Sequence, residues 1–255
     1  MKMKSILSAL AVVGLAVASQ SALATTITVT YAGSANFGSG GVGYYNGSIV
    51  PNPSSTSLVG VGIGGDSFTS TDFTYDFSAT GQFNTWCVDI YHWLNGGTVT
   101  YNVGTGADLA ASLNTLRPGT GTTRVTQLGQ LANEVYSTVD IKTKSAAFQL
   151  AVWAITYGTA DGSGYYQINT TNTGFRVDSG TASSAYGVLA NTWLANLGTA
   201  PNTGNYNLTY LNDGTKGITQ DMVVFTDSPT IPEPATLGLL AIGLLGLGYG
   251  RRKLA

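Results

Sequence analysis

Cys87 and Gln149 are the two residues of this sequence whose side chains could react with each other. Cys87 is the only cysteine among the 255 residues. It cannot form a disulfide within the chain, so it is inert, intermolecular or reactive. If its sulfur attacks the side-chain carbonyl carbon of Gln149 and ammonia leaves, a thioester joins the two residues. The sequence therefore contains a candidate internal crosslink.

The segment around Gln149 has the pattern of a buried helix. Residues 145–157 are apolar on nearly every face, and such a helix lies in a protein core. Gln149 would then place an amide in the core, where an unpaired amide costs about 1 to 3 kcal/mol. Bonding to Cys87 is one way to satisfy it. The residues expected to form a dry pocket around the pair are Trp86, Phe148, Val152 and Trp153.

A purely structural interpretation of the same pair stays open. Cys87 would then be a small buried apolar residue, and Gln149 an ordinary hydrogen-bonded core amide. His92, the only histidine, would lie on the opposite face of the strand that carries Cys87, which favours a structural or surface role. One histidine and one cysteine are too few for a zinc site, and we expect no metal and no cofactor.

The elements that must position this pair change in character along the chain. Short strand-like segments separated by Gly, Asn, Pro and Ser are expected at 26–31, 42–50, 57–63, 73–77, 83–91 and 98–103. Helical spacing follows in 125–135, 145–157 and 186–197, and strand character returns at 208–211 and 222–225. We therefore predict an α+β fold, with a β-sandwich or barrel framework, a helical insert and a flexible N-terminal strand region.

Both ends of the chain read as export signals. Lys2 and Lys4, the apolar run 6–18 and the small residues Ala22 and Ala24 predict a signal peptide, residues 1–24. At the other end a proline-rich triplet precedes the apolar run 235–249, which as a helix would reach about 23 Å and form a short membrane anchor. The triplet and the basic tip after the run comprise Pro232, Glu233, Pro234, Arg251, Arg252 and Lys253.

This tail resembles the PEP-CTERM sorting signal of Gram-negative bacteria over residues 231–255. The resemblance implies recognition by an exosortase, a membrane protease-transpeptidase that removes the tail near Pro232–Pro234. It also implies transient anchoring in the inner membrane, followed by a cell-surface or extracellular-matrix destination. The remaining domain is residues 25–230. Only 9% of the chain is charged and its net charge is −2, so no basic surface for nucleic acid is expected.

A second resemblance is to the thioester domain of bacterial surface adhesins. Phe148, Gln149, Val152 and Trp153 match that family's helix motif, and Trp86-Cys87 stands in the place of its cysteine motif. The resemblance spans roughly 70–226, with Gln220-Asp221 as a weaker trailing feature. It implies covalent capture of a lysine amine or a polysaccharide hydroxyl, once per molecule, and therefore not an enzyme.

Two other function classes are alternatives to covalent capture. The first is a non-covalent structural or carbohydrate-binding module of the extracellular matrix, with the same fold and no thioester. The second is a secreted hydrolase, but no spacing among the 13 acidic residues singles out a catalytic pair. The sequence also contains neither a hydrolase nucleophile elbow nor a phosphate-binding loop.

Overall fold

The computed structural model describes residues 25–35, 43–51, 56–75, 77–94, 96–214 and 219–228. The predicted signal peptide, the apolar anchor helix and the sorting triplet lie outside the described residues. Within the described ranges, no helix is both long and apolar enough to cross a membrane.

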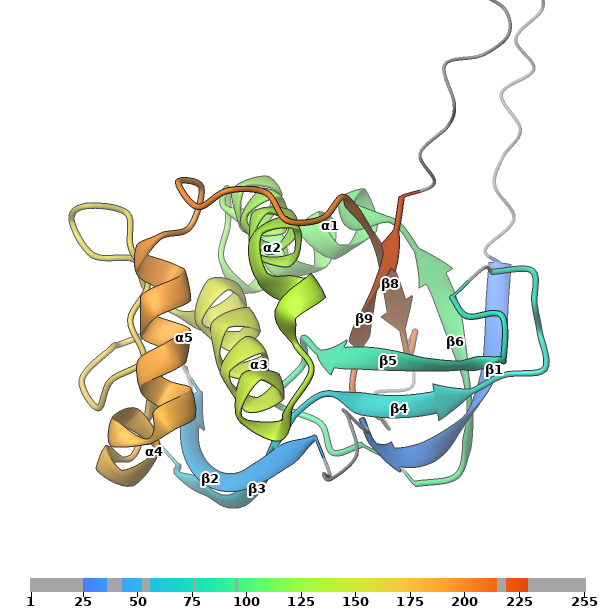
Figure 1. Ribbon diagram of the computed structural model, residues 1–255, viewed down its shortest axis with the longest axis horizontal. Coiled ribbons are helices and arrows are strands. Elements are labelled where there is room, and N and C mark those ends of the chain that lie inside the picture. Colours follow the sequence, from blue (N-terminus) through green and yellow to red (C-terminus); the bar gives the residue numbers. More distant parts are fainter. Residues whose placement is uncertain are drawn as a thin grey trace, which may run out of the picture.

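Six antiparallel strands of the described chain close into a barrel (Figure 1). The predicted β framework is therefore a barrel and not a sandwich. In order around the barrel the strands are β1 (Thr25–Ser34), β4 (Asp66–Thr69), β5 (Gln82–Cys87), β9 (Met222–Asp227), β8 (Tyr206–Asn212) and β6 (Thr98–Gly104).

The period-two pattern of β1 shows why these segments form barrel strands. Ile27 and Val29 point into the core and are buried, whereas Thr28 between them is exposed. The Thr28 hydroxyl lies 3.0 Å from that of Thr100 on β6, a cross-strand pair on the outer face. The N-terminal strand region predicted to be flexible includes β1, which pairs with β4 along one edge and with β6 along the other.

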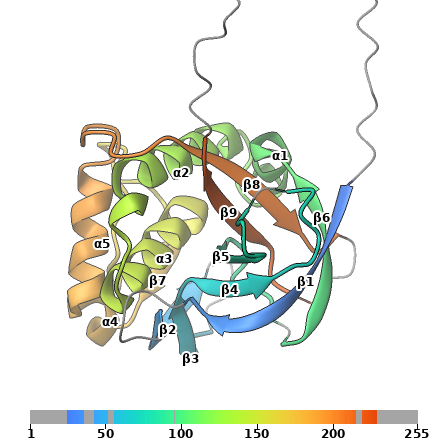
Figure 2. The same cartoon turned by 45° about the vertical axis from the view of Figure 1, so that its right-hand side comes forward.

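A helical insert and a second sheet of three strands complete the fold. The insert lies between β6 and β8 and packs on one side of the barrel (Figure 2). It contains α1 (Gly106–Leu116), α2 (Gly121–Val135), the 3-10 helix η1 (Tyr136–Thr138), α3 (Lys142–Tyr157), β7 (Phe175–Val177), α4 (Ser179–Ser183) and α5 (Ala185–Ala195). The second sheet has the order β3-β2-β7 and adds β2 (Tyr44–Pro51) and β3 (Leu58–Gly64).

Helix α3 lies at the centre of the molecule. In both views it stands between α5 and the barrel, and it contacts β2 and β3 of the second sheet as well (Figures 1 and 2). Every residue from Ser145 to Tyr157 is buried, as its apolar pattern predicted. The last carbonyls of α3 accept hydrogen bonds from two arginine side chains, at 2.9 Å from Arg117 to Tyr157 and 3.1 Å from Arg124 to Gly158.

Two predicted strands are corrected by the structure. The described residues of 73–77 form a loop and not a strand. Their alternating aromatic side chains serve packing in that loop, where Phe77 packs against Phe83 and Tyr75. The strand expected at 83–91 ends at Cys87, because the Asp89 carboxylate accepts the Tyr91 N–H at 2.9 Å and turns the chain. His92 therefore lies in a loop and not on the opposite face of that strand.

Candidate functional site

The carboxamide of Gln149 on α3 pairs with the main chain of Cys87 at the end of β5. Its Oε1 accepts the Cys87 N–H at 3.0 Å, and its Nε2 donates to the Cys87 carbonyl at 2.8 Å. The pairing of β4 with β5 starts at Asp66 opposite Thr85, so β4 offers Cys87 no strand partner. The amide takes the place that a next strand residue would fill.

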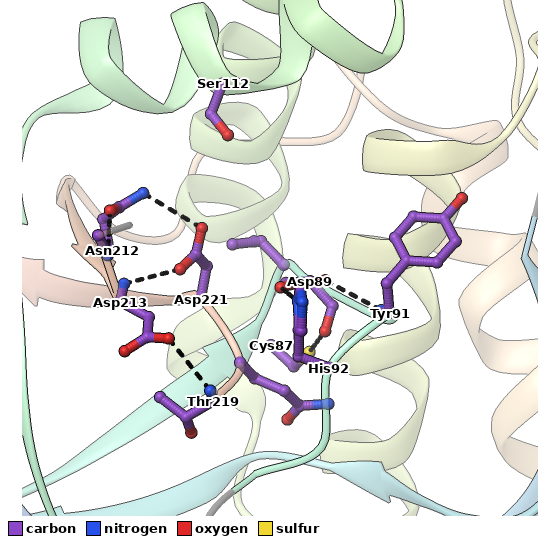
Figure 3. Close-up of polar contacts among 12 residues, drawn as sticks. Cys87, Asp89, Tyr91, His92, Ser112, Asn212, Asp213, Thr219 and Asp221 are labelled. Atoms are coloured by element: carbon purple, nitrogen blue, oxygen red, sulfur yellow. Dashed lines mark hydrogen bonds and ion pairs between the residues drawn. The ribbon is translucent and has the colours of Figure 1, made fainter. Parts of the chain in front are cut away.

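The Cys87 thiol lies in the same contact. It is 3% exposed, and its sulfur donates to the Asp89 carbonyl at 3.0 Å (Figure 3). Burial, and then the nearby Asp89 charge, hold the pKa of this thiol well above its usual value. The thiol is therefore protonated, and its hydrogen bond goes to the Asp89 carbonyl.

The four residues predicted to form one pocket separate into two groups around Gln149. Trp86 and Phe148 pack edge to face, with ring centroids 4.6 Å apart, in an aromatic cluster toward η1. Trp153 lies on another face of α3, where its ring packs against Phe175 with the ring centroids 6.0 Å apart. Val152 is fully buried on α3. Together the two groups exclude water from the amide.

The close packing of α3 on the barrel depends on Gly65, between β3 and β4. The Gly65 N–H donates to the Ser145 hydroxyl at 3.0 Å. A Cβ atom at Gly65 would stand 2.8 Å from the Trp86 ring, which is too close for a side chain. The absence of a side chain at Gly65 thus leaves room for the Trp86 ring. The hydrogen bond from Gly65 to Ser145 also holds the N-terminal half of α3, which carries Gln149, against the barrel.

Sequence reasoning missed a polar network that holds the segment after Cys87. The Tyr157 hydroxyl donates to the Val88 carbonyl at 2.8 Å, and the Val88 N–H donates to the Asp221 carbonyl at 3.0 Å. The Asp221 carboxylate accepts the Asp213 N–H at 2.8 Å (Figure 3). It also accepts the Tyr210 hydroxyl. Burial raises the pKa of Asp221. Of this network the sequence singles out only Gln220-Asp221, as a trailing feature of the resemblance to thioester domains.

The His92 side chain bonds Asp89 and not the Cys87–Gln149 pair. Its Nδ1 pairs with the Asp89 carboxylate in the loop that follows β5 (Figure 3), and its side chain is 43% exposed. Among the described residues, no group of three or more His, Cys, Asp or Glu side chains could hold a metal ion.

A groove that we call the Trp93 groove opens beside this contact, between β3 and the loop 88–94. It consists of two hollows of about 190 and 270 Å³ that share Val61, Trp93 and Gln220. The first hollow also borders Trp153 of α3. The other described lining residues are Ile49, Pro51, Leu58, Ile90, Tyr91 and His92 in the first hollow and Tyr31, Tyr44, Asn46, Gly60, Gly62, Gly64, Asp66 and Leu94 in the second.

Comparison with known proteins identifies the C-terminal tail. Residues 230–253 match the PEP-CTERM protein-sorting motif, in agreement with the predicted sorting signal. A search of curated proteins found no match, and a search of solved structures found none. The motif supports the assignment of this chain as a PEP-CTERM protein that an exosortase sorts for export to the cell surface.

Proposed function

We propose that residues 25–230 form a surface domain that captures a ligand covalently through a thioester between Cys87 and Gln149. The observation that carries the proposal is the double hydrogen bond between the Gln149 amide and the Cys87 main chain. It holds a buried carboxamide against the residue that bears the chain's single thiol. Each thioester would react once, so the protein would act as an adhesin of the surface or matrix and not as an enzyme.

The arrangement suits acyl transfer onto sulfur. The Cys87 sulfur would attack the Gln149 Cδ while the Cys87 N–H, 3.0 Å from Oε1, stabilises the negative charge that develops on that oxygen. The Cδ–Sγ bond forms, the Cδ–Nε2 bond breaks, and the thiol proton leaves with the departing ammonia. The aromatic groups on both sides would keep the product dry and slow its hydrolysis.

Intact mass of freshly folded protein tests the thioester. We expect the mature wild-type domain to weigh one ammonia less than its sequence and to bind methylamine covalently at Gln149. Cys87→Ala should abolish both signals and stay folded, since it keeps the main-chain pairing with Gln149. Gln130→Ala, on α2, is the matched control and should keep both signals. Full mass with an unmodified Gln149 amide would show that no thioester forms.

Gln149→Ala is a less clean probe, for a reason that the structure supplies. It removes the hydrogen bonds to both main-chain groups of Cys87, and an unsatisfied buried group costs about 1 to 3 kcal/mol. Loss of the mass signal in that variant must therefore be read together with its unfolding curve.

A non-covalent surface module is the second candidate function. The observation that favours it is that the Gln149 amide already bonds the Cys87 carbonyl and N–H without any covalent bond. The pair would then only fasten α3 to the barrel. In that case wild type should have full mass, and Cys87→Ala should change neither mass beyond the substitution nor ligand binding.

A further inference from the structure

The Trp93 groove combines flat aromatic surfaces with neutral polar groups. Trp93 is 63% exposed, and Tyr44 is 36% exposed on the facing strand. Gly62 has no side chain. A Cβ atom there would lie 3.5 Å from the Tyr44 ring, so the glycine leaves this side of the ring free of a covering side chain. Large exposed aromatic side chains beside a hollow are typical of binding sites.

The polar groups of the groove suit hydroxyl groups. Two amides, Asn46 and Gln220, line the second hollow, and each offers both a donor and an acceptor. Asp66 lines it too, and its carboxyl group can bond sugar hydroxyls. Alternating donors and acceptors around aromatic rings match a molecule that has apolar C–H faces and a rim of hydroxyls.

The charge of the lining disfavours an anionic ligand. None of the described residues that line the two hollows is a lysine or arginine, so a phosphate or an acidic polysaccharide would find no cationic side chain there. A peptide with acidic side chains is disfavoured for the same reason. The whole chain is likewise low in charge, with 9% charged residues.

We propose that the Trp93 groove binds a neutral glycan chain, with one sugar ring stacked on Trp93 and its hydroxyls bonded to Asn46 and Gln220. This binding site goes beyond the proposed covalent capture and does not depend on it. Neither Cys87 nor Gln149 is among the described residues that line the groove, and both are buried, so the glycan binds there without a covalent bond.

Calorimetric titration of the mature domain with neutral oligosaccharides tests the groove. The probes are cellohexaose, maltohexaose and laminarihexaose, with a chitosan hexamer and an oligogalacturonate as cationic and anionic comparisons. We expect at least one neutral probe to bind and Trp93→Ala to weaken it more than tenfold. Phe73→Ala is the matched control, since Phe73 is an aromatic residue 62% exposed outside the groove. Binding to none of the neutral probes, tighter binding of a charged probe, or an unchanged Kd in Trp93→Ala overturns the proposal.

Repeating the titration with Cys87→Ala separates the groove from the thioester. This variant cannot form the crosslink but keeps every described residue that lines the groove, so its glycan affinity should stay within about twofold of wild type. If glycans bind while wild type has full mass, the groove proposal stands and covalent capture fails. If wild type lacks one ammonia but binds no neutral probe, covalent capture stands and the glycan is not its ligand.

Discussion

At the residue scale, the distinctive feature is a side-chain amide that takes the place of a missing strand residue. Gln149 gives Cys87 the pair of hydrogen bonds that β4 does not provide. The same geometry serves two purposes. It satisfies a buried amide in a structural role, and it also gives the amide oxygen an N–H donor from the residue that carries the thiol. The intact mass of the folded protein distinguishes the structural role from the reactive one.

Asp66 is the second residue whose environment has a measurable consequence. Burial raises the pKa of its carboxyl from 3.8 to about 7, although the Tyr31 hydroxyl opposes that shift. Because the folded pKa lies above the unfolded one, the contribution of Asp66 to stability is fully present below about pH 4. It is lost as the pH rises through about 7, where the carboxyl must ionise in a partly buried place.

We therefore predict that Asp66→Asn removes this loss. Wild type and variant should have similar stability at pH 4. By pH 8 the variant should be more stable by about 2 to 3 kcal/mol, since one pKa unit is worth about 1.4 kcal/mol and partial contact with water reduces the total. Urea unfolding at a series of pH values measures it. Asp72→Asn is the control, because the Asp72 carboxyl is exposed and its pKa is lowered. Parallel stability curves for wild type and Asp66→Asn would contradict the prediction.

At the scale of elements, α3 is the helix on which the others are assembled. It contacts the barrel strand β5, the second sheet and α5 at once. Its C-terminal carbonyls are bonded by Arg117 and Arg124 from the first two helices of the insert. A helix surrounded in this way cannot present a polar face to water, which explains its all-round apolar sequence.

We predict that Trp153→Ala destabilises the domain by about 3 to 5 kcal/mol, because truncating a fully packed aromatic leaves a large cavity. Trp153 is 2% exposed on α3. Thermal and urea unfolding measure the change. Val188→Ala on α5 is the control, since Val188 is 55% exposed and such a substitution changes stability by about 0.5 kcal/mol or less. A loss below about 1 kcal/mol for Trp153→Ala would be incompatible with the packing of α3 described above.

At the scale of the whole molecule, the chain is a barrel domain between two predicted export segments. The described fold begins with β1 at Thr25, where signal cleavage after Ala24 would place the new N-terminus. It reaches β9 shortly before the sorting motif at 230–253. Both strands belong to the barrel, so removal of either flanking segment would leave every barrel strand in place.

We predict that Glu233→Ala leaves an unprocessed form that stays in the membrane fraction, because the change disrupts the Pro-Glu-Pro triplet within the matched motif. Wild type should be shortened and released. Immunoblots of membrane, surface and medium fractions measure the two forms. Glu134→Ala is not a suitable control, since Glu134 is buried and accepts the Gly198 N–H. Asp161→Ala, at an exposed turn, serves instead. Normal release of Glu233→Ala would exclude the triplet as a processing determinant.

Much of the fold could be predicted from local patterns. Short strand-like segments indicated β1, β6, β8 and β9, and the all-round apolar pattern of 145–157 indicated a buried α3. The short strands β4 and β7 and the helix α1 escaped prediction. β4 has four residues and β7 three, too few for a period to show, and tertiary pairing rather than local preference makes them strands. The alternating aromatic residues at 73–77 predicted a strand wrongly, because a loop that packs its aromatic side chains together can show the same alternation.

The sequence by itself determined the C-terminal sorting motif and the burial of α3, and it predicted the signal peptide and the candidate pair Cys87 and Gln149, because each follows from residue type and local spacing. Only the tertiary structure decided how that pair meets. Gln149 bonds the main chain of Cys87 because β4 offers Cys87 no partner. The Trp93 groove likewise unites Tyr44, Trp93 and Gln220, which are far apart in the chain. These contacts depend on how the barrel closes. Local sequence patterns do not predict which distant residues a closed barrel brings together.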